Sequence, residues 1–243
     1  MRIPTQDSLL PTPSAPKRRR SILVRVLKWT LASVAIIAAT PFVLAGLVLL
    51  LLYFESGPTE STDLVRFHLP GRGFAIPDNY QPSVFSYAPP AEPYAFEIIA
   101  LLPNFSGYSK ERRKDWFSVG TGAPSLRIYV HSSARTMRPD ELIRSELEDA
   151  IDKNGQAGPA GLRRYDIRDG ASSIFEIVYV PEQPGDVIYI GCHINEGAIM
   201  NCQLHAIYDD TATFDVSFGS DHLVDWPRIA AGTRRLLKSF QTY

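Results

Sequence analysis

An uninterrupted run of uncharged residues extends from Trp29 to Phe54 and contains 26 residues. A helix of that length extends about 39 Å, which exceeds the roughly 30 Å hydrocarbon core of a bilayer. A cleaved signal peptide has a shorter apolar segment that ends in small residues, whereas this run ends in Leu49–Phe54. The sequence therefore predicts a retained transmembrane helix over residues 29–54, in contact with the lipid bilayer.

Charge is divided unequally on the two sides of this run. Residues 1–28 carry seven basic side chains and one acidic side chain, whereas residues 55–243 carry a net charge of −7. Short basic segments resist translocation, so residues 1–28 are predicted to be a disordered cytoplasmic tail and the rest of the chain to lie on the outer side of the membrane. This division argues against a cytosolic enzyme and against a nucleic-acid binder that works through a basic patch.

A polar linker, residues 55–63, is expected to lead into an α+β domain of residues 64–243. Helical spacing of apolar residues predicts one helix from Pro139 to about Asn154 and a second over residues 225–240. Short runs rich in β-branched and aromatic residues predict strands at 64–69, 96–102, 126–131, 162–168, 174–180, 187–194, 200–208 and 213–218. Strands this closely spaced can only be joined as hairpins, which predicts a mainly antiparallel sheet.

Two segments of the domain are less regular. Residues 70–93 contain six prolines, which predicts a loop with little strand pairing. Residues 110–116 are either a short helix or a solvated loop.

The two cysteines, Cys192 and Cys202, lie in neighbouring predicted strands, with Gly197 available for a turn between them. If they pair, one register separates apolar from polar residues along the whole hairpin. The facing pairs are then Ile194–Met200, Ile190–Leu204 and Ile188–Ala206 on one side, and His193–Asn201 and Tyr189–His205 on the other. The sequence therefore predicts a structural disulfide between Cys192 and Cys202, and the absence of a CxxC spacing argues against a redox-active pair.

The motifs of nucleophilic catalysis, phosphate binding, dinucleotide binding and metal ligation are absent from the sequence. His193 and His205 share one side of the predicted hairpin, but at strand rise they lie about 13 Å apart, too far to share a metal ion. Both are expected to be surface residues. We therefore predict no catalytic, cofactor-binding or metal-binding residue, no cofactor and no enzymatic activity.

Two parts of the chain carry a resemblance to a known group of proteins. The first part is Ile76–Tyr80, which has the pattern IPxNY and is followed by an apolar strand that ends in Leu102–Phe105. The second part is Leu223–Phe240. These segments resemble single-pass inner-membrane proteins of proteobacteria, a group without an assigned activity. Some such periplasmic domains resemble immunity proteins that neutralise toxins delivered between bacteria. The resemblance implies a bacterial inner-membrane location with residues 64–243 in the periplasm, and it carries over no site residue.

Five aromatic residues in or near the proline-rich segment are candidates for contacts with a protein partner, because exposed aromatic side chains often anchor interfaces. They are Phe74, Tyr80, Phe85, Tyr87 and Tyr94. They pack equally well onto their own sheet, and the hydroxyl of Tyr80 is expected to tie down the segment rather than to contact a ligand.

The leading hypothesis is therefore a membrane-anchored periplasmic domain that binds another protein, as an immunity or inhibitor protein against a delivered toxin. One alternative is a structural subunit of an envelope assembly or secretion machine, in which the transmembrane helix also makes contacts. A second alternative is a hydrolase whose site forms only on folding.

Overall fold

The structure is a computed structural model that describes residues 40–44, 46, 57–82, 95–132 and 138–242. The chain divides into two units, residues 1–55 and 56–243. The helices of the second unit are η1 (Asp78–Tyr80), α2 (Arg113–Trp116), α3 (Pro139–Leu147), η2 (Pro159–Gly161), η3 (Ser220–Asp225) and α4 (Trp226–Phe240). Its strands are β1 (Leu64–Leu69), β2 (Arg72–Pro77), β3 (Ala95–Leu101), β4 (Ser125–Ser132), β5 (Gln156–Ala157), β6 (Leu162–Asp166), β7 (Ile177–Pro181), β8 (Val187–Asn195), β9 (Ala198–Asp209), β10 (Ala212–Gly219) and β11 (Gln241–Thr242).

The predicted transmembrane run, residues 29–54, falls largely outside the described residues. The part that is described, residues 40–44 and 46, is helical. Within the described residues, no helix is both long enough and apolar enough to cross a membrane. The segment boundaries predicted at residues 28, 54 and 63 stay predictions.

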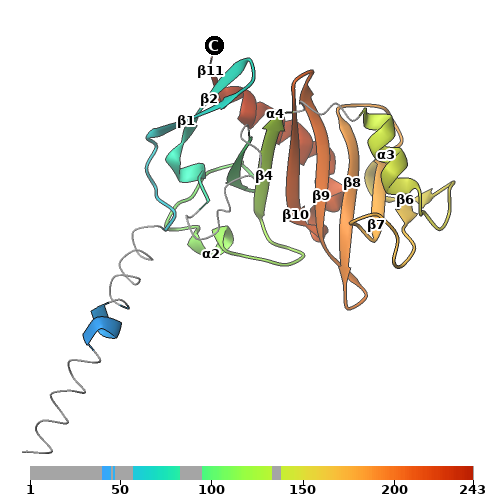
Figure 1. Cartoon of the computed structure of the whole chain (residues 1–243), viewed down its shortest axis with the longest axis horizontal. Helices are drawn as coiled ribbons and strands as arrows, with labels where there is room; N and C mark the ends of the chain where they lie inside the picture. The colour runs from blue at the N-terminus through green and yellow to red at the C-terminus, as the bar shows by residue number, and fades with distance from the viewer. Residues whose placement is uncertain (1–39, 45, 47–56, 83–94, 133–137, 243) are drawn as a thin grey trace, which may run out of the picture. The chain divides into compact units, whose positions relative to one another are not determined.

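The second unit is built on an eight-stranded sheet in the order β3-β4-β10-β9-β8-β7-β6-β5 (Figure 1). Every pairing in this sheet is antiparallel, which confirms the predicted α+β class with a mainly antiparallel sheet. A smaller sheet, β1-β2-β11, lies beside β3.

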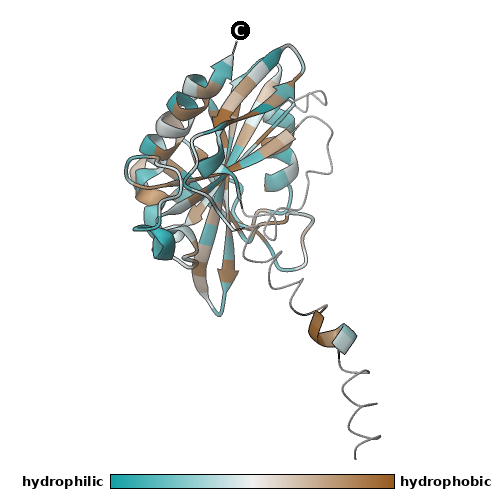
Figure 2. Cartoon of the chain, turned by 90° about the vertical axis from the view of Figure 1, so that its left-hand side faces the viewer, coloured by the Kyte–Doolittle hydropathy of each residue, from teal (hydrophilic) through white to brown (hydrophobic). Residues whose placement is uncertain are grey.

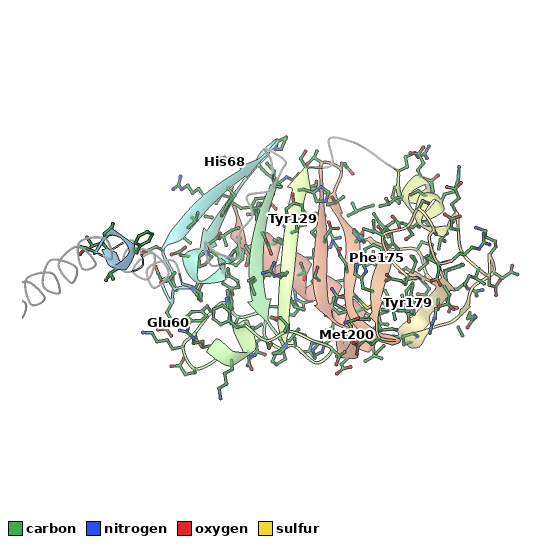
Figure 3. All side chains as sticks on the ribbon, turned by 60° about the horizontal axis from the view of Figure 1, so that its bottom comes forward. Glu60, His68, Tyr129, Phe175, Tyr179 and Met200 are labelled. Atoms are coloured by element: carbon green, nitrogen blue, oxygen red, sulfur yellow. A yellow bond between two sulfur atoms is a disulfide. The ribbon has the colours of Figure 1, made fainter. Side chains whose placement is uncertain are left out.

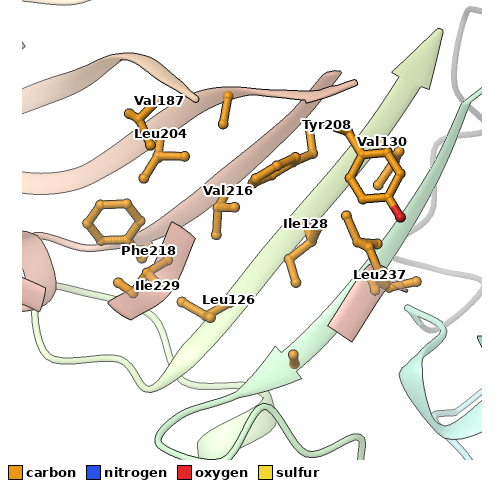
Figure 4. Packing of buried hydrophobic residues seen from close by; sticks show 14 of the residues in the cluster. Leu126, Ile128, Val130, Val187, Leu204, Tyr208, Val216, Phe218, Ile229 and Leu237 are labelled. Atoms are coloured by element: carbon orange, nitrogen blue, oxygen red, sulfur yellow. The ribbon is translucent and has the colours of Figure 1, made fainter. Parts of the chain in front are cut away.

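Helix α4 covers one face of the large sheet. Its first turn contains Pro227, which is favourable there because that position needs no backbone donor. Its apolar residues recur at helical spacing, and Ile229 and Leu237 are fully buried against strand residues such as Leu126 and Val216 (Figure 4). Figure 2 shows that hydrophobic and hydrophilic residues alternate along the strands. The C-terminal helix predicted from helical spacing over residues 225–240 is thus confirmed.

Helix α3 covers the opposite face, but only at the end formed by β6, β7 and β8. Leu142, Ile143 and Leu147 pack there onto a second apolar cluster, which contains Phe175 and Tyr189. The helix is shorter than predicted because the chain after it joins the edge of the sheet, where Ala150 pairs with Ile167. Ile151, inside the predicted helix, lies beyond the end of α3 and is 65% exposed.

The prediction of a loop over residues 70–93 is wrong for its first part. Residues 72–77 form β2, paired with β1 through a tight turn at Gly71, whose φ of +80° suits glycine. Pro70 lies in the turn before this strand and Pro77 is its last residue, so neither removes a backbone donor from the middle of the ladder. The prediction failed because it used the number of prolines and not their positions. Residues 110–116 contain the short helix α2.

The disulfide between Cys192 and Cys202 is confirmed. The two residues face each other in the β8–β9 hairpin, and Tyr189–His205 and Ile190–Leu204 pair as predicted. The register shifts at both ends of the hairpin, so Ile194 faces Ile199 and Val187 faces Ala206 instead of the predicted partners. The central register is the predicted one because it places both sulfurs in the apolar core between α4 and the sheet.

Gly232 of α4 packs closely against Phe105, and this contact fixes the position of the helix against the sheet. A Cβ atom added at Gly232 would lie 2.1 Å from the tip of the Phe105 ring. Both residues are buried. The helix therefore accepts glycine in its interior, although alanine is the better helix former.

Gly232→Ala is expected to lower the free energy of unfolding by about 2 kcal/mol, because overpacking outweighs the gain of about 1 kcal/mol in helix propensity. Urea denaturation measures this difference. In a Phe105→Leu background the same substitution should be neutral or stabilising, since the ring tip is gone. Stabilisation by Gly232→Ala in the otherwise unchanged chain would contradict the packing argument.

Candidate functional site: the polar face of the central sheet

A row of side chains crosses the large sheet on the face opposite α4, which Figure 3 shows with Tyr129 and Phe175 labelled. Successive residues of a strand point to opposite faces, so the buried residues Phe214 and Val216 of β10 direct Asp215 to this side. Antiparallel register then sets neighbours side by side in the order Glu97, Tyr129, Asp215, His205 and Tyr189. We refer to the part of this face formed by β3, β4, β10 and β9 as the polar face.

Asp215 lies at the centre of the row, and its side chain is only 14% exposed. One carboxylate oxygen is 2.7 Å from Nδ1 of His205, and the other is 3.5 Å from Nε2 of His131. Burial alone would raise the pKa of Asp215, but hydrogen bonds with the two histidines and their charges lower it to about 2. The carboxylate is therefore held in its charged form by its neighbours.

The arrangement around Asp215 resembles a proton relay only superficially. In a Ser–His–Asp relay the two ring nitrogens of the histidine contact different partners. Here the same nitrogen of His131, Nε2, is the one nearest both Asp215 and Thr213 Oγ1, which is 3.0 Å away. Nε2 of His205 is buried and has no hydrogen-bond partner. The geometry therefore stabilises a buried carboxylate and does not align a nucleophile.

Among the residues that the structure describes, no group of three or more His, Cys, Asp or Glu side chains is placed to hold a metal ion.

Phe175 covers the end of the row. Its ring centre lies 5.9 Å from that of His205 and 5.0 Å from that of His193, and His205 stacks on Tyr189 at 4.3 Å. The ring reaches this position because β8 has Gly191 beneath it, where an added Cβ atom would lie 2.2 Å from the ring. The expectation that His205 is a surface residue is therefore wrong, because Phe175 and Tyr189 lie against its ring and leave only 15% of the side chain exposed. His193 is partly exposed and contacts Glu176 at 3.3 Å.

Arg127 and Glu97 form an ion pair at the other end of the polar face, with 3.3 Å between Nη1 and Oε1. Glu97 is largely buried, and its burial raises the pKa of its carboxyl while Arg127 lowers it. Arg127 keeps 51% of its side chain exposed, and Tyr129 next to it is partly exposed. This end of the face therefore has a half-exposed guanidinium, paired with Glu97, next to a partly exposed aromatic ring.

The predicted partner-binding aromatic residues have different positions. Phe74 is 1% exposed and packs against Phe96 in the core, so it is not available to a partner in this structure. Tyr80 is half-buried and donates a hydrogen bond to the carbonyl oxygen of Phe105 at 3.0 Å, which confirms the expected structural role. Phe85, Tyr87 and Tyr94 lie outside the described residues.

Sequence reasoning missed Asp215, His131 and Arg127. They lie in strands far apart in the chain, and only the pairing of β4 with β10 makes them neighbours. The one available signal was the alternation of polar and apolar residues in both strands, which predicts a polar face without predicting its partners.

The chain is similar in fold to a protein of known structure. No protein-family model matches the chain, and no curated protein matches its sequence. Among solved structures, the chain is similar to Smlt3025, an immunity protein of the Stenotrophomonas maltophilia type IV secretion system, with a TM-score of 0.51 and 16% identity. The match covers 75% of this chain and 95% of that chain. The two proteins therefore share a fold over most of their length.

The low pKa of Asp215 predicts a pH dependence of stability. A carboxyl group whose pKa is lower in the folded state than in the unfolded state stabilises the fold above its unfolded pKa, and this contribution is lost as the pH falls through the folded pKa. Between pH 5 and pH 2, the unfolding free energy of the unchanged chain should therefore fall by about 2 kcal/mol more than that of Asp215→Asn.

Urea denaturation of both chains across this pH range measures the difference. Asp140→Asn serves as the matched control, because the Asp140 side chain is 60% exposed. The difference between the two variants then isolates the effect of the buried carboxylate. Parallel pH profiles for Asp215→Asn and the unchanged chain would contradict the assigned electrostatics.

Proposed function

We propose that this chain is an immunity-like protein whose domain, residues 64–243, binds and neutralises a toxin delivered between bacteria. The observation that carries the proposal is the fold shared with Smlt3025, an immunity protein, over 95% of that chain. A shared fold at 16% identity supports a class of function and does not identify the toxin.

The chemistry of the polar face also favours binding over catalysis. Asp215 and His205 satisfy one another inside the sheet, and their geometry offers no aligned nucleophile. Arg127 and Tyr129 belong to residue types that are enriched at protein interfaces, and both are accessible. A rigid sheet with such side chains suits recognition of another protein surface.

We propose the membrane anchor on the sequence alone. Trp29–Phe54 is long enough to span a bilayer, and the seven basic residues before it favour a cytoplasmic N-terminus. An inhibitor held at the periplasmic side of the inner membrane would meet a toxin as it arrives.

A strain that lacks this chain is expected to be killed by its unmodified siblings on a solid surface, where cells touch, and to survive beside them in shaken liquid culture. The full-length chain should restore survival, because it binds the toxin that siblings deliver. Colony counts after co-culture measure the effect.

The controls separate the parts of the proposal. Replacing residues 1–54 with a cleavable signal peptide tests whether the anchor is needed for protection. A deletion strain that survives contact but fails to secrete or loses envelope integrity would contradict the immunity proposal and favour a structural subunit.

A further inference from the structure

A hollow of about 620 Å³ lies at one end of the polar face, where β4 and β10 meet the chain that follows α2. Its apolar lining includes Ile99, Trp116, Phe117, Val119 and Met200. Met200, labelled in Figure 3, comes from β9. Among the described lining residues, Arg127 alone is ionisable, so the hollow is an apolar surface with one cation in its wall.

Two apolar side chains of this hollow are unusually accessible to solvent. Val119 is 93% exposed and Phe117 is 50% exposed. Scattered apolar residues are normal on a protein surface, but here two of them border a concave apolar lining. Val119 in particular projects beyond the hollow, so only a surface that extends past the rim would cover it.

The segment that presents Val119, residues 117–123, is held by hydrogen bonds on several sides. The hydroxyl of Ser118 donates to the carbonyl oxygen of Asp115 at 2.6 Å, and the hydroxyl of Ser125 donates to the carbonyl oxygen of Ser118 at 3.2 Å. The backbone N–H of Asp221 donates to the carbonyl oxygen of Thr121 at 3.0 Å. The apolar residues are therefore presented by a segment that is already ordered, which lowers the entropy lost on binding.

This segment is also packed tightly against the end of β10. An added Cβ atom at Gly219 would lie 2.2 Å from the carbonyl oxygen of Thr121. The backbones of the segment and of β10 therefore approach as closely as glycine permits.

Charges of both signs lie near the hollow. The Arg113 guanidinium lies 5.6 Å from the centre of the Phe117 ring. Arg127 pairs with Glu97 through Nη1, and its side chain is still half exposed. Asp115 is paired with Arg112 at 2.9 Å, and the carboxylate of Asp221 lies beside Gly122, near the other end of the segment. A carboxylate on a partner would therefore be complementary to Arg113 and Arg127.

We propose that the hollow binds a partner protein through a segment in which a large apolar side chain stands next to a carboxylate. The apolar side chain fills the hollow and covers Val119 and Phe117. The carboxylate accepts hydrogen bonds from Arg127, and Arg113 adds favourable charge. The inference deepens the proposed function, on which it rests for the protein nature of the partner.

The test is a selection of random 12-residue peptides displayed on phage against the immobilised full-length chain. Selected peptides are expected to place Trp, Phe, Leu or Met within two positions of Asp or Glu. The best peptide should bind at least about tenfold more weakly to Val119→Asp and to Arg127→Gln, in line with the loss of an interface hot spot. Val119 is 93% exposed, so Val119→Asp should keep the thermal stability of the unchanged chain. Arg127→Gln removes the ion-pair partner of the largely buried Glu97 and should lower the thermal stability slightly while the chain stays folded.

Ile151→Asp is the matched control, because it places the same acidic residue at another exposed apolar position, beside α3. It should leave peptide binding unchanged. Equal binding by Val119→Asp, Arg127→Gln and the unchanged chain would overturn the inference, as would selection of basic peptides or of none.

The co-culture assay keeps the two proposals distinguishable. If the unchanged chain protects cells, Val119→Asp and Arg127→Gln are expected to lose protection while Ile151→Asp retains it. Full protection by both variants would overturn the assigned surface and leave the immunity proposal intact. Failure of the unchanged chain to protect, together with selective binding of acidic–apolar peptides, would overturn the immunity proposal alone.

Discussion

The two-residue alternation of side chains along β10 determines both faces of the sheet. Phe214, Val216 and Phe218 enter the core beneath α4, whereas Asp215 and Ser217 point to the polar face. Because β10 lies between β4 and β9, its register also decides which side chains of both neighbours share each face. The α4 core and the polar row are thus two consequences of one set of strand pairings.

The buried carboxylate of Asp215 favours the observed register of β10 over registers shifted by one residue. A slip of β10 by one residue would move Asp215 into the apolar core, away from His205 and His131, and an unpaired buried charge is strongly unfavourable. In the observed register, the histidines outweigh the effect of burial and the carboxylate stays charged. The shift in the β9–β10 register lies between Ala212 and Thr213, near the turn, and the pairing around Asp215 is continuous. The polar cluster therefore disfavours alternative pairings that hydrophobicity alone would allow.

Local features of the fold could be predicted from the sequence, and features that depend on distant pairing could not. The central register of the β8–β9 hairpin follows from Cys192 and Cys202, which are close in the chain. Strand β2 was missed because the prolines were counted without regard to their positions, Pro70 in the turn before the strand and Pro77 at its end. The site was missed because His131 and Asp215 become neighbours only when β4 pairs with β10, and alternation within a strand does not specify its partner.

The polar row lies on central strands of the sheet, and the hollow is bordered by a connecting segment. The row is built on central strands, where a change of register would disturb the core, whereas Phe117 and Val119 lie on a connection between α2 and β4. Connections vary more readily than the strands they join, because core strands require apolar volume and alternation while connections are constrained mainly by their own hydrogen bonds. Two chains can therefore share this fold at 16% identity and differ in their connections, and under the proposed function the choice of partner would depend on the segment that presents Val119.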